Sequence, residues 1–218
     1  MTYKRVFAFG DSVTYGHELS DCPTNTCPTP SNLSYGALVA NGLSAEYHCH
    51  AMGSYANNAI SRRIIESLPM LTHNDMVLVM WTFTIRHEIL LEGDAGWCSL
   101  SPQGTMPIEK EYFKYIDTAP HYHIGKTLKE IYISQQLLTA ASIPHIFVSS
   151  VTDLSQEIQS QTNLLSTKLD LDKWILFDQD FGFIDWAKHV LNLQFSRQHP
   201  PDTAHQILAK KILTKIYE

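Results

Sequence analysis

The sequence predicts an α/β protein, a three-layer α/β/α sandwich around a central parallel sheet of about five strands. Short apolar runs alternate with longer segments of helical spacing through the whole chain, as in strands joined by crossover helices. The run MVLVMW at 76–81 is continuously apolar, the pattern of a central strand covered on both faces. With 44% hydrophobic residues among 218, the chain can fill one core, and we expect a single domain over residues 1–218.

The elements are punctuated by glycine and proline. Gly10 ends the first apolar run, Gly42 and Pro69 end the first two helical segments, and the proline-rich residues 20–33 form a loop. Residues 92–120 show no periodic pattern, and so long an irregular stretch often covers a functional site. The expected strands are 6–9, 46–50, 76–81, 145–149 and 174–177, and the expected helices are 34–43, 58–68, 121–141 and 203–217.

Charge and hydropathy narrow the range of partners. Sixteen basic against twenty-two acidic residues give a net charge of −6, without the Lys/Arg cluster that a nucleic acid or an anionic membrane surface requires. The N-terminus has too few apolar residues for a signal peptide, and no run reaches the roughly eighteen of a membrane span. We therefore expect a cytoplasmic protein that binds neither nucleic acid nor membranes. Export without a signal and a place in a virus particle stay open.

Neither the cysteines nor the histidines predict a metal site. Cys22 and Cys27 flank a short turn and either form a local disulfide or stay thiols, the expected state in a reducing cytosol. Two histidine pairs lack a third ligand at a metal-binding spacing, His48 with His50 and His121 with His123. The sequence therefore predicts no metal site.

Candidate functional residues gather where the predicted strands end. Ligands of parallel sheets bind beyond the carboxyl ends of the strands, and this rim receives Asp11-Ser12, Gly53 and Trp81-Thr82. Ser12 has two interpretations at its strand-to-helix turn. It caps the following helix by accepting a backbone N–H, or it is a nucleophile beside N–H groups that hold an oxyanion.

Two sequence blocks favour the second interpretation by resemblance. The stretch FAFGDSVTYGHEL resembles the first block of the SGNH/GDSL hydrolases, whose serine, here Ser12, is the nucleophile. The stretch HPPDTAHQILAKKI resembles their last block, in which His-Pro precedes the final helix, so His199 corresponds to the catalytic base. The resemblance covers the chain in order. It implies the flavodoxin-like fold of that family and an ester hydrolase that needs no cofactor.

The catalytic acid of the family is missing from its usual place. It stands three residues before the histidine, where this chain has Ser196. A Ser-His dyad is one solution, with the His199 ring oriented by a backbone carbonyl or by a carboxylate from elsewhere. The other is the pair Asp202 and His205, for which the structural alternative is a helix N-cap followed by a polar first-turn residue.

The asparagine that serves the oxyanion hole in the family's third block is also missing. The corresponding stretch, MVLVMWTFTIRHE, resembles a little-characterised branch of SGNH-like proteins that carries Trp-Thr followed by Arg and Glu. Thr82 or Arg86 can supply a donor in its place, and an arginine also suits an anionic substrate group. Alternatively, Arg86 and Glu88 form a structural ion pair while Trp81 fills the core.

The second block is better preserved. AMGSYANNAISRRI keeps Gly53, whose backbone N–H is an oxyanion donor in the family that the chain resembles. Asn57 and Asn58 match a Ser-Asn-x-x-Ile run of the same branch. These two side chains either face the pocket or cap the helix that follows.

Together these patterns predict a serine hydrolase that cleaves an ester of a carbohydrate or another small polar substrate. Ser12 would attack after His199 removes its proton, and the N–H groups of Ser12 and Gly53 would hold the oxyanion, with Thr82 or Asn57 as a side-chain donor. Two alternatives stay open: a binding module that kept the fold and lost catalysis, and an acyltransferase that uses the same serine.

Overall fold

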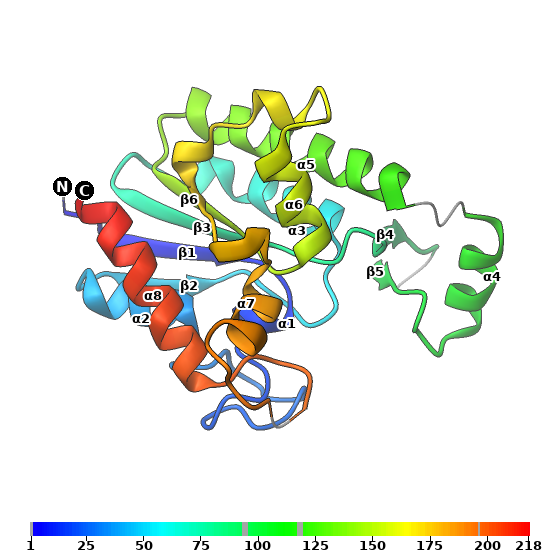
Figure 1. The fold of residues 1–218 in the computed structure, drawn as a ribbon, viewed down its shortest axis with the longest axis horizontal. Coiled ribbons are helices and arrows are strands. Elements are labelled where there is room, and N and C mark those ends of the chain that lie inside the picture. Colours follow the sequence, from blue (N-terminus) through cyan, green and yellow to red (C-terminus); the bar gives the residue numbers. More distant parts are fainter. Residues whose placement is uncertain (1, 93–95, 117–119, 196) are drawn as a thin grey trace.

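The computed structural model describes residues 2–92, 96–116, 120–195 and 197–218. Within these ranges five strands form a fully parallel sheet in the order β2-β1-β3-β6-β7 (Figure 1). All five predicted strands are confirmed, the last one shortened by two residues. They are β1 (Arg5–Phe9), β2 (Glu46–Cys49), β3 (Asp75–Trp81), β6 (His145–Ser149) and β7 (Trp174–Ile175).

Two hydrophobic layers cover the sheet. Alternate side chains of a strand point to opposite faces, so Leu78 of β3 packs on one side and the fully buried Trp81 on the other. The prediction that Trp81 fills the core is therefore confirmed, as is the three-layer sandwich. The layer around Leu78 contains α2 (Tyr35–Gly42), α7 (Phe183–His189) and α8 (Asp202–Tyr217), and the layer around Trp81 contains α3 (Asn57–Ser67), α5 (Pro120–Ala140) and α6 (Thr152–Ser160).

The helix boundaries follow local signals. The side chain of Ser34 caps α2 by accepting the N–H of Ala37 at 3.4 Å. Pro69, which has no N–H, lies just after α3, where the chain tightens into the 3₁₀ turn Leu68–Met70. The four predicted helices are confirmed to within one residue at each end. The sequence did not predict α6 and α7, which are short and, in α6, mostly polar.

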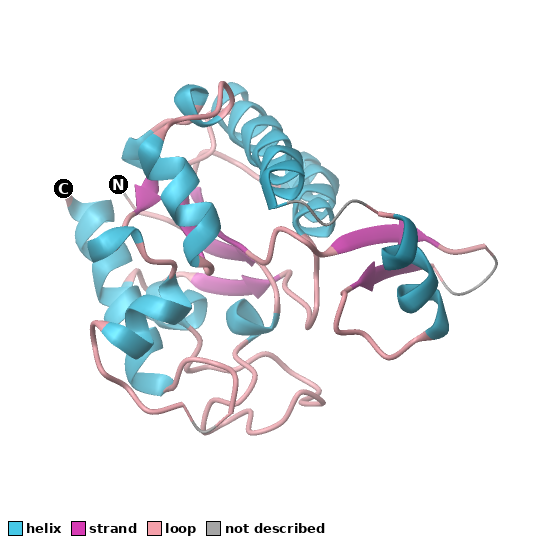
Figure 2. Cartoon of the chain, turned by 45° about the vertical axis from the view of Figure 1, so that its right-hand side comes forward, coloured by secondary structure: helices cyan, strands magenta, loops and turns pink. Residues whose placement is uncertain are grey.

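A hairpin and a short helix form an arm that projects from the sheet (Figures 1 and 2). β4 (His87–Leu90) pairs antiparallel with β5 (Trp97–Leu100), and α4 (Pro107–Tyr115) follows. We define the arm as residues 87–92 and 96–116. The irregular chain predicted over 92–120 is thus wrong for the part that the structure describes, because elements of four to nine residues are too short to show a period.

The structure also bears on the cysteines, the histidine pairs and membrane segments. All four cysteines are free thiols, so Cys22 and Cys27 form no disulfide. His48 and His50 both pack against Phe7, on one face of the sheet edge. Within the ranges given above, no three His, Cys, Asp or Glu side chains gather as at a metal site. No helix in those ranges has both the length and the apolar character to cross a membrane.

Candidate active site

Ser12 lies at the carboxyl end of β1, where the chain turns into the four-residue helix α1 (Ser12–Tyr15). The cap of this helix is Asp11, whose Oδ1 accepts a backbone N–H of the first turn at 3.0 Å. Gly10 has no room for a side chain, because a Cβ there would lie 2.0 Å from the hydroxyl of Thr14. Because Asp11 and not Ser12 caps α1, the capping interpretation of Ser12 is wrong, and the Ser12 hydroxyl is left for another partner.

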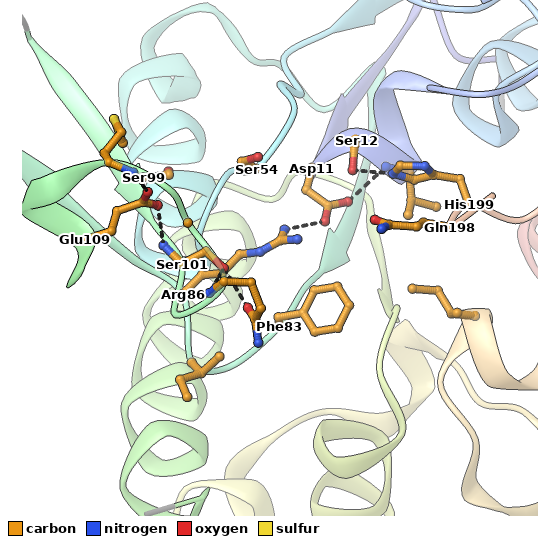
Figure 3. Close-up of a pocket in the computed structure, with 16 residues that line it drawn as sticks. Asp11, Ser12, Ser54, Phe83, Arg86, Ser99, Ser101, Glu109, Gln198 and His199 are labelled. Atoms are coloured by element: carbon orange, nitrogen blue, oxygen red, sulfur yellow. Dashed lines mark hydrogen bonds and ion pairs between the residues drawn. The ribbon is translucent and has the colours of Figure 1, made fainter. Parts of the chain in front are cut away.

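That partner is His199, which reaches Ser12 from the loop before α8. Its Nε2 lies 2.8 Å from Oγ of Ser12, at hydrogen-bond distance (Figure 3). Both groups are shielded, with 8% of Ser12 and 15% of the His199 side chain exposed. When Nε2 carries no proton, it can accept the hydroxyl proton, which is the geometry of a nucleophile with its general base.

Glu18 lies behind the His199 ring, and the sequence did not predict it. Its Oε1 is 3.2 Å from Nδ1 of His199, an ion-pair distance without the direction of a full hydrogen bond. Its Oε2 accepts the backbone N–H of Gln198 at 2.9 Å and that of His199 at 3.1 Å. Burial raises the pKa of Glu18, but these bonds outweigh burial and hold the pKa below its ordinary value. A carboxylate from elsewhere in the chain therefore lies beside the ring.

The turn after α1 places this carboxylate. Gly16 ends α1 with a φ of +88°, and Glu18 itself has a φ of +68°, a conformation that is strained for a residue with a Cβ. The N–H of Glu18 donates to the carbonyl of Cys22 at 2.9 Å and closes the turn. The one sequence signal that could have found Glu18 is its place as an acidic residue shortly after Ser12. Ser196, at the family's usual acid position, lies outside the described residues.

The alternative pair Asp202 and His205 is engaged elsewhere. His205 is fully buried, and its Nδ1 accepts the N–H of Tyr35 at 3.1 Å. Burial lowers the pKa of His205 to about 3, so its ring is neutral. Asp202 is the first residue of α8 and not its N-cap, and its carboxylate accepts the N–H and hydroxyl of Ser20 at 3.0 and 2.6 Å. The prediction of His205 as a polar residue on the surface of the first helical turn is therefore wrong, because its side chain lies in the core.

Two predicted oxyanion donors, Thr82 after β3 and Asn57 at the start of α3, bond to each other instead. Asn57 accepts the N–H of Thr82 at 2.8 Å and donates to its carbonyl at 3.0 Å. The Thr82 hydroxyl donates to Oδ2 of Asp11 at 2.6 Å, and Nη1 of Arg86 donates to the same oxygen at 2.8 Å. This network ties the end of β3 to the turn that carries Ser12. It occupies the side chains of Asn57 and Thr82.

Glu88 and Asn58 also differ from their predicted roles. Glu88 accepts hydrogen bonds from Nε and Nη2 of Arg62 at 2.8 and 2.7 Å, so the predicted Arg86–Glu88 ion pair is wrong. Asn58 accepts the N–H of Glu88 at 2.9 Å and donates to its carbonyl at 3.0 Å. Ala56 is the N-cap of α3, so neither predicted asparagine caps this helix.

Ser12 and His199 open into two adjoining cavities of about 660 and 640 Å³. Ser54, Arg86 and Gln198 also line both of them. Because Ser12 lies between the cavities, a ligand bound at its hydroxyl can extend into both of them. The arm-side cavity is further lined by Phe83, Ile85, Ser99, Ser101, Gln103 and Met106, and the other cavity by Tyr15, His17, Asn25, Cys27, Met52 and Gly53.

Gly53 lies close to a second histidine in this cavity. A Cβ on Gly53 would lie 2.9 Å from Cε1 of His17, so glycine permits the approach of the two segments. The His17 ring stands edge-on to that of His199, with centroids 6.2 Å apart. Burial, followed by the charge of His199, lowers the pKa of His17 and favours its neutral form.

The amino-acid sequence matches no protein-family model and no curated protein. The fold, in contrast, is similar to solved structures. One is a member of the lipolytic protein G-D-S-L family from Veillonella parvula DSM 2008, with a TM-score of 0.55 and 10% identity over 97% of both chains.

Two carbohydrate esterases of family 2 are similar as well. The enzyme of Corynascus thermopiles, solved with its carbohydrate binding domain, has a TM-score of 0.57 and 14% identity over 98% of this chain and 65% of its own. The enzyme of Clostridium thermocellum, in complex with cellohexaose, has a TM-score of 0.51 and 14% identity over 98% of this chain and 63% of its own. The chain thus spans just under two thirds of these esterases. These likenesses confirm the predicted fold, that of the SGNH/GDSL hydrolases.

Proposed function

We propose that the protein is a serine hydrolase that cleaves an ester, with Ser12 as nucleophile, His199 as general base and Glu18 as the acid behind it. The 2.8 Å contact between Oγ of Ser12 and Nε2 of His199 carries the proposal. A serine that only stabilised its turn would need no shielded imidazole, and another residue already caps α1. The occurrence of this fold among esterases supports the same reaction class.

The reaction proceeds in two halves. Nε2 of His199 takes the hydroxyl proton of Ser12 while Oγ bonds to the ester carbonyl carbon, and the N–H groups of Ser12 and Gly53 stabilise the oxyanion. The imidazolium then protonates the alcohol oxygen, which leaves as its C–O bond breaks and an acyl group remains on Ser12. Water deprotonated by the same imidazole attacks this acyl group, releases the acid and restores the serine.

Glu18 prepares the imidazole for both halves. With Nδ1–H facing the carboxylate, Nε2 is the nitrogen that accepts a proton. The negative charge of Glu18 then stabilises the imidazolium that forms. Because Oε2 also binds the backbone N–H of His199, the same carboxylate positions the ring and the main chain.

The substrate that we propose is an ester of a carbohydrate or another small polar alcohol. Amide side chains line both cavities, among them Asn25, Gln103 and Gln198, and can bond to sugar hydroxyls. Phe83, 41% exposed, gives the arm-side cavity an apolar wall. The carbohydrate esterases of the same fold support this choice. Similarity to a G-D-S-L protein over 97% of both chains further supports a single domain over residues 1–218.

Labelling with a fluorophosphonate, followed by mass spectrometry of the intact protein, tests the nucleophile and its base. Wild type should gain one adduct, Ser12→Ala none, and His199→Ala should label at least about 100-fold more slowly. His73→Ala removes an exposed histidine and should label as wild type does. Loss of labelling in Asp202→Asn, with labelling retained in His199→Ala, would indicate that His205, paired with Asp202, is the base instead of His199.

Acetylated mono- and oligosaccharides then test the substrate class. Wild type should release acetate from at least one of them, and Ser12→Ala should not. Preferential transfer of the acetyl group to an added sugar would indicate an acyltransferase instead. Binding of a glycan without an adduct or turnover would indicate a binding module.

A further inference from the structure

We infer that Arg86 supplies the side-chain N–H that stabilises the oxyanion, the role that an asparagine has in the SGNH hydrolases. This role rests on the proposed function and adds a catalytic residue to it. Among the predicted side-chain donors, the Thr82 hydroxyl donates to Asp11. The amide nitrogen of Asn57 donates to the backbone carbonyl of Thr82 and to the hydroxyl of Thr127. Arg86 is the predicted donor whose N–H groups are not used up in this way.

The guanidinium of Arg86 lines the same cavities as Ser12 and His199 and has N–H donors that are free for a ligand. Arg86 lines both cavities together with Ser12 and His199, and Figure 3 shows it extending toward Asp11 and the turn that carries Ser12. Its Nη1 donates to Asp11 at 2.8 Å and to the Thr82 hydroxyl at 3.2 Å. Toward the rest of the described chain, Nε and Nη2 make no hydrogen bond. Three of the five N–H groups therefore remain for a ligand.

Contacts on three sides fix this guanidinium before a substrate binds. Asp11 is 1% exposed and directly precedes Ser12, so its ion pair ties Arg86 to the segment that holds the nucleophile. The ring centroid of Phe83 lies 4.6 Å from Cζ of Arg86. Asn57 in turn fixes Thr82, the third contact. A donor held in this way stabilises a developing charge without having to reorganise.

The charge of Arg86 suits an oxyanion better than a neutral amide does. The carbonyl oxygen is neutral in the ester and negative in the tetrahedral intermediate, so a cationic donor gains most where the charge develops. Asp11 balances this cation in the free protein.

Kinetics on 4-nitrophenyl acetate and its thionoester, which has C=S in place of C=O, separate an oxyanion donor from a structural arginine. Sulfur accepts hydrogen bonds weakly, so loss of a donor slows the ester more than the thionoester. Arg86→Gln should lower kcat on the ester about 100- to 1000-fold at a KM within about threefold of wild type. The ratio of ester to thionoester rates should fall at least about tenfold. Arg86→Lys, which keeps a cation for Asp11, should recover part of the loss.

Arg63→Gln is the matched control, because it removes an arginine of α3 outside both cavities, and it should leave both rates unchanged. Equal losses on ester and thionoester, or a raised KM at unchanged kcat, would overturn the role of Arg86. So would a lowered ratio in Ser54→Ala and not in Arg86→Gln, which would assign the donor to Ser54. If thermal melting shows that Arg86→Gln does not fold, Arg86→Lys carries the comparison and should show a smaller fall of the same ratio, whereas an unchanged ratio would overturn the role. Wild type without an adduct or turnover would instead overturn the proposed function itself.

Discussion

Glu18 holds His199 at two points, because Oε1 lies 3.2 Å from Nδ1 of the ring and Oε2 accepts the backbone N–H of the same residue at 3.1 Å. In the family that the sequence resembles, the acid precedes the histidine. Here the carboxylate beside the histidine comes from the turn after α1, in the same short segment as Ser12. His199 therefore contacts two residues of one segment, Ser12 and Glu18.

Glu18→Gln should lower kcat by about 10³- to 10⁴-fold with little change in KM. An amide cannot stabilise the imidazolium, and it favours the wrong tautomer of His199. Steady-state hydrolysis and the rate of fluorophosphonate labelling both measure this. Glu46→Gln, on a side chain that is 69% exposed, serves as the control. Activity of Glu18→Gln near that of wild type would mean that the carboxylate only holds the loop.

The buried His205 should make the fold sensitive to acid. Its pKa is about 3 in the folded protein and about 6.5 in an unfolded chain, so between these values only the unfolded chain gains a proton. The free energy of unfolding therefore falls as the pH drops from about 6.5 toward 3 and does not depend on this group above 6.5. His205→Gln should reduce the slope by up to ~1.4 kcal/mol per pH unit. Urea unfolding at pH 7 and pH 5 measures it, and equal slopes in both proteins would contradict the expectation.

Asn57→Ala should lower the free energy of unfolding by about 1–3 kcal/mol, because it leaves the buried N–H and carbonyl of Thr82 without partners. Asn58 makes the same pair of bonds to Glu88 at a less buried position, so Asn58→Ala should cost less. Urea titrations of the two variants give the comparison. A larger loss in Asn58→Ala would show that the end of β3 does not depend on Asn57.

Cys27 should react with iodoacetamide before Cys22 does. Cys22 is buried, and burial raises the pKa of its thiol to about 12. Cys27 is partly exposed, and its hydrogen bond with Cys22 lowers the pKa of its own thiol, which favours the reactive thiolate. Peptide mass mapping after brief alkylation should find the label at Cys27, and Cys27→Ser should lack it. Recovery of a Cys22–Cys27 disulfide peptide would contradict the free thiols.

The sheet could be predicted from the sequence because each of its central strands is buried on both faces. Such strands read as unbroken apolar runs, and 76–81 is the clearest of them. The arm could not be predicted in this way. Its strands, HEIL and WCSL, are held by pairing with each other, and four residues show neither a period nor a register.

The same distinction applies to the site. Ser12 and His199 could be placed because each lies in a short sequence block that resembles one of the SGNH/GDSL hydrolases, and such a block can be recognised without the fold. Glu18 could not, because its contact with His199 spans 181 positions and depends on a turn with positive φ. The asparagines could not be assigned either. An asparagine at the start of a helix can cap that helix or bond to another segment. Here the backbone of residues 82–88 passes close to both asparagines and takes their hydrogen bonds.

The bonds that build the site join distant parts of the chain, since Ser12 and His199 are 187 positions apart and Ser20 and Asp202 are 182 apart. During synthesis Ser12 leaves the ribosome long before His199. A chain stalled anywhere before residue 199 therefore carries Ser12 without the imidazole that contacts its hydroxyl. Contacts over such separations close late in folding. The proposed catalysis then begins only with the last of these closures, so an unfinished polypeptide should be inactive.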